Sequence, residues 1–145
     1  MKKSGILNPS ILGLVGKLGH RDMVAVTDRG FPLASDPEIT TVDVSVVANL
    51  PSVLDVAIPL SREIIVEEVI FATETARENS AFLEKIRSEL PGIPETSISH
   101  AEFKKLVLGL DTETSIQPTD RMIGQIRTGE FTPYTNVVFV CGVSF

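Results

Sequence analysis

The sequence has few of the features that mark secreted or membrane-spanning proteins. Cys141 is the only cysteine in 145 residues, so the chain forms no internal disulfide and gives no support for an oxidising compartment. We therefore expect a reducing compartment, the cytoplasm. The apolar stretch after Met1 is interrupted by Asn8-Pro9-Ser10 and by Lys17, and no other apolar run approaches membrane-spanning length. The sequence predicts neither an export signal nor a membrane span.

Positive charge and nucleotide-binding motifs are also scarce. The chain has 13 Lys and Arg against 19 Asp and Glu, for a net charge of −6, which argues against binding to nucleic acid or an anionic membrane. No GxGxxG, P-loop or GxSxG pattern occurs, and the two histidines lack the spacing of a zinc-binding pair. These absences leave a small, neutral molecule as the expected partner.

The composition is that of a globular protein with an apolar surplus. Hydrophobic residues make up 43% of the chain and charged residues 22%, and the mean hydropathy is +0.21. A chain of this length forms one domain with a real core, so we expect a single domain over residues 1–145. In a small domain, apolar residues beyond those needed for the core often form contacts between subunits.

Helical and strand patterns alternate along most of the chain. Caps and apolar spacing predict helices over 9–18 and 100–108 and a longer helix within 74–90. Leu50-Pro51-Ser52 predicts the start of another helix, which reaches at least residue 57. Strands are predicted over 23–27, 41–47, 64–71, 96–98, 122–127 and 136–143, and a loop over 109–120. The alternation indicates the α/β class, as a three-layer sandwich with a mostly parallel central sheet.

Two candidate residues bracket the first predicted strand. In open α/β sheets ligands collect at the carboxyl ends of strands, which is where Asp28 lies. His20 lies in the connection before the strand, and five residues at ~3.3 Å each place the two strand ends about 16 Å apart. Either the loop after Gly19 folds back, or the site is shared between chains.

Each candidate also has an ordinary structural interpretation. His20 follows a helix and can interact with its terminal carbonyls, and Asp28 can cap a turn. His100 stands in the first turn of a helix with the capping box Ser99-x-x-Glu102, and Tyr134 can be a packing residue. Taken one by one, these residues do not decide between packing and function.

Six short motifs occur in a fixed order along the chain. They are Met1-Lys2-Lys3 with Leu7-Asn8, Leu18-Gly19-His20 with Asp22, Asp28-Arg29-Gly30-Phe31-Pro32, His100-Ala101-Glu102-Phe103-Lys104, Ile126-Arg127-Thr128-Gly129-Glu130, and Pro133-Tyr134-Thr135-Asn136 with Cys141-Gly142-Val143-Ser144-Phe145. In this order and at these distances from both termini, the chain resembles the D-ribose pyranase and fucose mutarotase family over nearly its whole length.

The resemblance implies a cofactor-free sugar mutarotase, with the pyranase members moving D-ribose between pyranose and furanose rings. On the family's pattern His20 matches the catalytic proton donor, and no metal is implied. The substrate-binding positions match Asp28, His100, Tyr134, Thr135 and Asn136. The resemblance also implies a ring-shaped homo-oligomer with the site near the contact between neighbours, which would account for the separation of His20 from Asp28.

The chain departs from the family at three positions. Arg29 stands where ribose pyranases often carry a small residue, Phe31 where they often carry leucine, and Thr135 where alanine is frequent. We interpret Arg29 as one partner of an ion pair between subunits, although contact with an anionic sugar is the alternative. His100 favours the ribose branch of the family. A mutarotase for fucose or another monosaccharide, a non-catalytic sugar-binding protein, and a metal site of two histidines and a carboxylate remain as alternatives.

Overall fold

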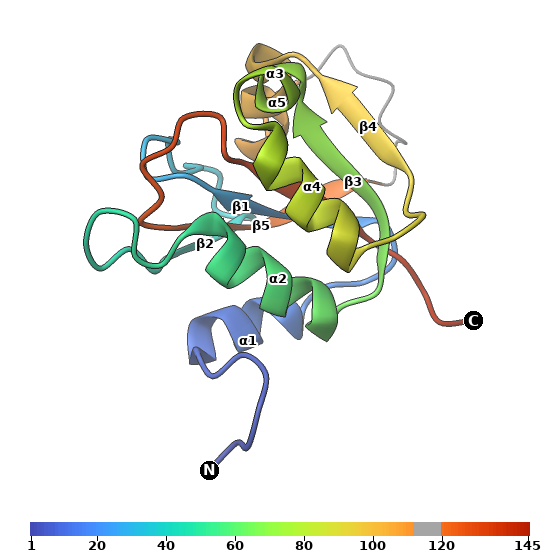
Figure 1. Cartoon of the computed structure of the whole chain (residues 1–145). Coiled ribbons are helices and arrows are strands. Elements are labelled where there is room, and N and C mark those ends of the chain that lie inside the picture. The colour runs from blue at the N-terminus through green and yellow to red at the C-terminus, as the bar shows by residue number, and fades with distance from the viewer. Residues whose placement is uncertain (112–119) are drawn as a thin grey trace.

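The computed structural model describes residues 1–111 and 120–145, which form a sheet flanked by helices (Figure 1). The strands are β1 (Asp22–Thr27), β2 (Thr40–Asp43), β3 (Val66–Ala72), β4 (Glu95–Ile98), β5 (Arg121–Arg127) and β6 (Val137–Cys141). The helices are α1 (Pro9–Val15), α2 (Val53–Glu63), α3 (Thr73–Glu78), α4 (Ser80–Glu89) and α5 (His100–Val107). The strands form one six-stranded sheet in the order β2-β5-β1-β6-β3-β4.

All strand pairs except those of β6 are parallel. β1 and β2 pair in parallel with β5, and β3 pairs in parallel with β4, whereas β6 runs antiparallel to both β1 and β3. The predicted mostly parallel sheet is therefore confirmed. We call the edge at which Thr27, Ala72 and Arg127 end their strands the carboxyl edge, and the opposite edge, at which Cys141 ends β6, the amino edge.

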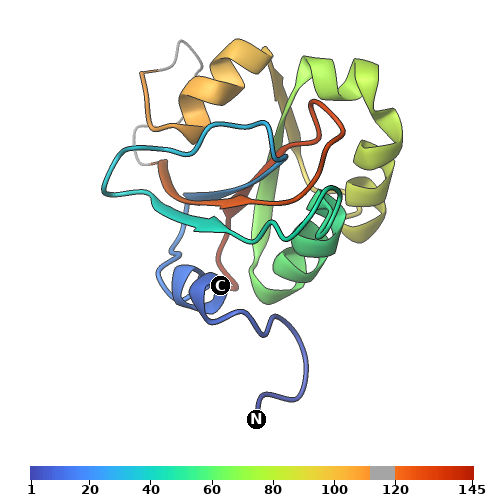
Figure 2. The same cartoon turned by 90° about the vertical axis from the view of Figure 1, so that its left-hand side faces the viewer.

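The central strands are buried on both faces, and each face packs against its own helices. In β1, Val24 and Val26 belong to one apolar core with α1, α2 and α4, while Met23 and Ala25 belong to a second core with α5. Figure 2 shows helices on either side of the sheet. This arrangement confirms the predicted α/β three-layer sandwich and explains why β1 reads as a continuous apolar run.

The helix starts follow the predicted caps. The Asn8 side chain accepts hydrogen bonds from the first backbone N–H groups of α1, and the Ser99 side chain does the same for α5. α1 ends at Val15, earlier than predicted, because the backbone then tightens into i→i+3 hydrogen bonds from Lys17 and Leu18.

The longer helix predicted within 74–90 is shorter than expected, because this segment is divided into α3 and α4. The break lies at Asn79, whose side chain caps α4 by accepting a hydrogen bond from Phe82 N and donates another to Thr135 Oγ1 at 2.9 Å. These two bonds hold Asn79 at a non-helical φ of −145°. A side chain with partners in two segments thus overrides the helical pattern around it.

The other differences concern where elements end. The strand predicted over 41–47 ends at Asp43, whose carboxylate turns the chain by accepting the N–H of Ser45. The strands predicted over 64–71 and 136–143 occupy Val66–Ala72 and Val137–Cys141. Most of the predicted loop over 109–120 lies outside the described residues. Within the described part, no helix is long and apolar enough to cross a membrane.

Candidate functional site

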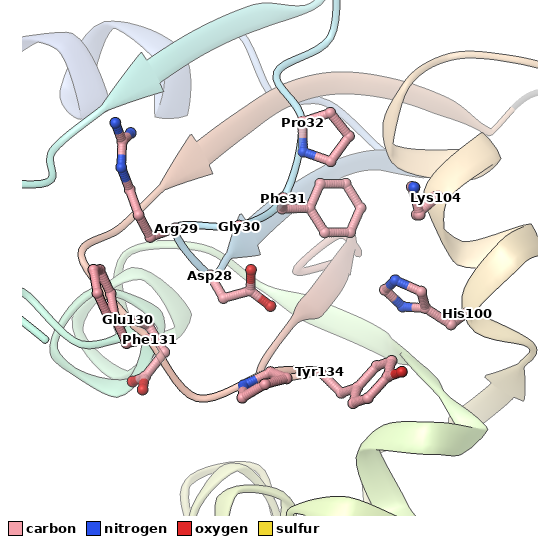
Figure 3. Close-up of a pocket in the computed structure, with 11 residues that line it drawn as sticks. Asp28, Arg29, Gly30, Phe31, Pro32, His100, Lys104, Glu130, Phe131 and Tyr134 are labelled. Atoms are coloured by element: carbon pink, nitrogen blue, oxygen red, sulfur yellow. The ribbon is translucent and has the colours of Figure 1, made fainter. Parts of the chain in front are cut away.

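A pocket of about 430 Å³ opens at the carboxyl edge, a volume suited to a small ligand (Figure 3). It lies between the loop after β1, the first turn of α5 and the loop that joins β5 to β6. The polar and aromatic side chains that line it include Asp28, Phe31, His100, Lys104, Glu130 and Tyr134. Three of the predicted site residues, Asp28, His100 and Tyr134, therefore meet at one cavity.

Asp28 is buried and is held by the side chain of Asn136. Asn136 Nδ2 donates to Asp28 Oδ2 at 2.8 Å, and Asn136 Oδ1 accepts from the backbone N–H of Asp28 at the same distance. Burial raises the pKa of the Asp28 carboxyl, and the hydrogen bond from Asn136 opposes that shift. Asn136 itself is fully buried and does not line the pocket. It fixes the carboxylate from behind.

The imidazole of His100 packs edge-to-face between two aromatic rings. Its centroid lies 5.0 Å from that of Tyr134 and 6.1 Å from that of Phe31. Burial lowers the pKa of His100, so the ring is neutral at neutral pH and can both donate and accept a proton. Its Nδ1 atom is buried and has no hydrogen-bond partner among the described residues. A ligand hydroxyl could supply that partner.

Helix α3 and the residue after it hold the loop that carries Tyr134. Tyr134 has a left-handed φ of 60°, and its carbonyl accepts a hydrogen bond from the buried Thr75 hydroxyl at 2.6 Å. Thr135 is buried, accepts from Asn79 and does not line the pocket. Of the predicted tripeptide, only Tyr134 reaches the cavity. No local sequence signal identifies Thr75 or Asn79 as supporting residues, because their partners lie more than fifty residues away.

Arg29 lies on the wall of the pocket but is paired within its own chain. Its Nη1 atom lies 2.9 Å from Asp43 Oδ2, and Arg127 Nη2 lies 2.6 Å from the same oxygen. In Figure 3 the Arg29 side chain extends away from the space between Asp28 and His100. The charged partner expected from a neighbouring subunit is thus present in this chain, at the end of β2.

His20 lies at the other end of β1, at the amino edge. Its side chain is 51% exposed, and Nε2 lies 3.0 Å from Glu67 Oε2. The loop does not fold back, because the backbone N–H of the next residue, Arg21, donates to Cys141 O at the end of β6. The six residues of β1 span about 20 Å at ~3.3 Å each. Within one chain, His20 and the carboxyl-edge pocket are separate.

A second, open cavity of about 380 Å³ surrounds His20. The last residues of the chain, 141–145, line it together with Ile65. Across residues 1–111 and 120–145, no group of three or more metal-ligating side chains is close enough to hold an ion. The two histidines, on which a metal site would depend, lie at opposite edges of the sheet.

Comparison with known proteins gives similarities that extend over the whole chain. The model of the RbsD / FucU transport protein family matches residues 1–144. Two D-ribose pyranases, from Lactobacillus gasseri and Thermosipho africanus, are 37% and 35% identical to this chain, with complete coverage of both sequences in each case. The structure of Bacillus subtilis RbsD complexed with D-ribose matches with a TM-score of 0.84, 33% identity and complete coverage of both chains. The fucose mutarotase from Streptococcus pneumoniae matches over 96% of this chain and 95% of its own, with a TM-score of 0.66 and 18% identity, which supports the fold alone.

Proposed function

The chain belongs to the RbsD / FucU transport protein family, and from this premise we propose that it is a D-ribose pyranase. It is an isomerase that interconverts the pyranose and furanose forms of D-ribose by opening and closing the sugar ring. The proposed location is the cytoplasm, which the single cysteine of the sequence supports.

One observation carries the proposal: a pocket of sugar size lies at the carboxyl edge of a chain that is 33% identical, over its full length, to RbsD complexed with D-ribose. The pocket combines a buried carboxylate, a neutral imidazole and a tyrosine, which are groups that bind hydroxyls. An aromatic wall of Phe31, Phe131 and Tyr134 suits the apolar face of a sugar ring.

The chemistry needs two proton transfers. To open a cyclic hemiacetal, the anomeric hydroxyl loses a proton while the ring oxygen gains one, and the bond between the anomeric carbon and the ring oxygen breaks. Closure by a different hydroxyl repeats these steps in reverse and forms the other ring. A positioned acid or base typically contributes 10²- to 10⁴-fold to such a step.

We assign binding and proton transfer to different residues. Asp28 accepts hydrogen bonds from sugar hydroxyls, held in place by Asn136, while His100 and Tyr134 bind the remaining hydroxyls. Thr135 supports the loop that carries Tyr134. His20 is the proton donor. Because the amino and carboxyl edges are separate within one chain, we propose that His20 reaches the pocket of a neighbouring copy.

Exposed apolar side chains at both edges support this head-to-tail assembly. At the carboxyl edge, Val46, Val47 and Phe131 are 73%, 61% and 62% exposed. At the amino edge, Ile65 and Phe145 are 48% and 103% exposed. A contact between two different surfaces forms a closed ring when the rotation from each copy to the next brings the last copy back against the first. The proposed assembly is a ring-shaped homo-oligomer.

The first experiment measures ring exchange directly. Saturation-transfer NMR on D-ribose reports how fast the pyranose and furanose signals exchange when protein is added. We expect the wild-type protein to accelerate exchange and His20→Ala to lose about 10²-fold or more of that acceleration. L-Fucose, tested in parallel, identifies a mutarotase of different sugar specificity. Unchanged ribose exchange with the wild-type protein would refute the proposal.

The second experiment tests the shared site. His20→Ala and Asp28→Asn are each expected to be inactive alone. In a mixed assembly, however, some sites combine the intact His20 of an Asp28→Asn copy with the intact Asp28 of a His20→Ala copy. Unfolding and refolding the two variants together should therefore restore part of the activity, whereas variants refolded separately and then combined serve as the control. Sedimentation velocity on the same samples gives the oligomeric state. No recovery in proven mixed assemblies would place both residues of a site in one chain.

A further inference from the structure

Glu67 lies against His20 and is itself held from the opposite side. Glu67 Oε2 lies 3.0 Å from His20 Nε2, while Glu67 Oε1 lies 2.8 Å from Arg21 Nη1. Arg21 is fixed in turn by Asp120, whose side chain is 3% exposed and lies 2.7 Å from Arg21 Nη2. A buried carboxylate thus anchors the guanidinium, and the guanidinium anchors the carboxylate that faces the imidazole.

A β-bulge in β3 explains how Glu67 reaches this position. Val66 pairs with Cys141, but Glu68 pairs with Val140, so Glu67 is an extra residue in the ladder between β3 and β6. Consecutive residues of a regular strand point to opposite faces, yet Glu67 and Glu68 both contact Arg21. Bulges redirect side chains in this way and are common beside active sites.

The space for the Glu67 side chain is created by a glycine at the end of the chain. A Cβ atom at Gly142 would lie 3.0 Å from the Cβ of Glu67 and 3.2 Å from Oε2, the oxygen that faces His20. A side chain at 142 would therefore press on Glu67 and shift it by a few tenths of an ångström. Two chain segments, the bulge and the residue after β6, place Glu67 at the imidazole.

From these contacts we infer that Glu67 is a positioning residue for His20. Its carboxylate accepts the Nε2–H of the imidazole and leaves the unprotonated Nδ1 to take the proton of the anomeric hydroxyl and then donate it to the ring oxygen, so that the ring returns to its starting state. The hydrogen bond on one ring nitrogen of a histidine determines which nitrogen carries the proton in the neutral ring. The part played in proton exchange depends on the function proposed above for His20, whereas the orientation and tautomer rest on the contacts alone. An exposed ion pair adds little stability, so the effect of Glu67 is on orientation.

The tautomer is measured on protein with ¹⁵N-labelled histidine. Only His20 and His100 contribute signals, and the spectrum of His20→Ala identifies those of His20. At about pH 8.5, roughly two units above the ordinary histidine pKa, we expect the wild-type His20 ring to be mainly the Nε2–H tautomer. In Glu67→Gln we expect a mixture, because the carboxamide can either accept a hydrogen bond from Nε2–H or donate one to an unprotonated Nε2. A mainly Nδ1–H ring in the wild type, or an unchanged ring in the variant, would overturn the inference.

Glu68→Gln is the matched control. Glu68 also contacts Arg21, at 3.3 Å, and lies on the same strand, but its contacts in the described structure are with Arg21 and Thr96 rather than His20. We expect Glu68→Gln to keep the wild-type tautomer and turnover. Glu67→Gln should lower turnover of ribose about tenfold, a part of the 10²- to 10⁴-fold that a positioned acid supplies, with KM unchanged because the carboxyl-edge pocket is intact.

The proton-donor role of His20 and the positioning role of Glu67 can be refuted separately. Full activity of His20→Ala would refute the proton-donor role but leave the tautomer result valid. An inactive His20→Ala together with a fully active Glu67→Gln would keep the proposed function and remove Glu67 from it. Melting curves of both glutamine variants, expected to match that of the wild-type protein, show whether a loss of turnover comes from unfolding.

Discussion

The two edges of the sheet hold their polar residues by different physical means. At the carboxyl edge, Asp28 and His100 are packed among apolar and aromatic groups, and burial shifts the pKa of both. At the amino edge, His20 and Glu67 are part of an ion-pair cluster that faces solvent. Burial fixes side chains in a shaped cavity within one chain, whereas an exposed cluster orients groups without enclosing a ligand. The carboxyl edge therefore resembles a binding site, whereas the amino edge resembles a surface that presents a proton donor to another copy.

Among changes at the carboxyl edge, the largest expected effect comes from removing the charge of Asp28. Asp28→Asn keeps the shape of the side chain but removes the carboxylate that binds sugar hydroxyls. Hydrogen bonds to a charged group contribute about 1.5–3 kcal/mol, so we expect ring exchange to slow by up to about 10²-fold. Asp43→Asn is the control, because Asp43 lies at the same edge and pairs with Arg29 and Arg127 instead of facing the pocket. Saturation-transfer NMR measures both variants. Similar losses would show that the edge as a whole, and not Asp28, carries the activity.

A steric change at the carboxyl edge is expected to cost stability. A Cβ atom at Gly129 would lie 2.4 Å from the backbone oxygen of Leu50 and 2.6 Å from that of Val47. Gly129→Ala should therefore lower the free energy of unfolding by about 1–3 kcal/mol. Gly13→Ala, in α1 and with no atom within 4 Å of the new Cβ, should instead raise it by up to about 1 kcal/mol. Urea denaturation measures both, and equal shifts would contradict the tight contact at Gly129.

A smaller effect is expected from the buried imidazole. Burial lowers the pKa of His100, so near pH 6 the unfolded chain binds this proton more tightly than the folded protein does. Stability is thus lost as the pH falls through the pKa of the folded state, with a slope of at most about 1.4 kcal/mol per pH unit. His100→Gln should flatten the curve between about pH 8 and pH 5. Parallel curves for the two proteins, measured by urea denaturation, would show that burial does not perturb this histidine.

The smallest effect is expected at Arg29. Its ion pair with Asp43 is partly exposed, with 44% and 32% of the two side chains accessible, and such pairs contribute about 0–1 kcal/mol. Because the Arg29 side chain also extends away from the space between Asp28 and His100 (Figure 3), Arg29→Ala should change KM for D-ribose by less than about fivefold. A larger increase in KM would show that Arg29 contacts the sugar, and testing an anionic monosaccharide would then be the next step.

The sequence predicts most of the fold because its strongest signals are local. The caps at Asn8 and Ser99 depend on neighbours within three residues, and the structure has both. The break at Asn79 was missed because its reason is a bond to Thr135, 56 residues away. The end of β2 was missed for a different reason, because the turn at Asp43 depends on a local hydrogen bond from Ser45 N that the alternating pattern over 41–47 conceals.

Part of the site is also predictable from local features of the sequence. Counting along β1 correctly separates His20 from Asp28, since strand length follows from residue number. The rule that ligands gather where parallel strands end identifies Asp28, which follows β1, whereas His100 and Tyr134 are predicted only by the family resemblance. By contrast, the bulge that directs Glu67 towards His20 depends on the pairing register of two strands, which has no local signature.

The alternation of side chains along β6 limits how this protein can change in length. Val137 and Phe139 belong to one core, while Val138 and Val140 belong to the other. A one-residue insertion or deletion would exchange these side chains between the two cores. It would also shift either Asn136 away from Asp28 or Gly142 away from Glu67. Residue types in β6 can vary within the limits of packing, but the number of residues between Asn136 and Gly142 cannot. Alignments of related sequences are therefore expected to show substitutions there without gaps.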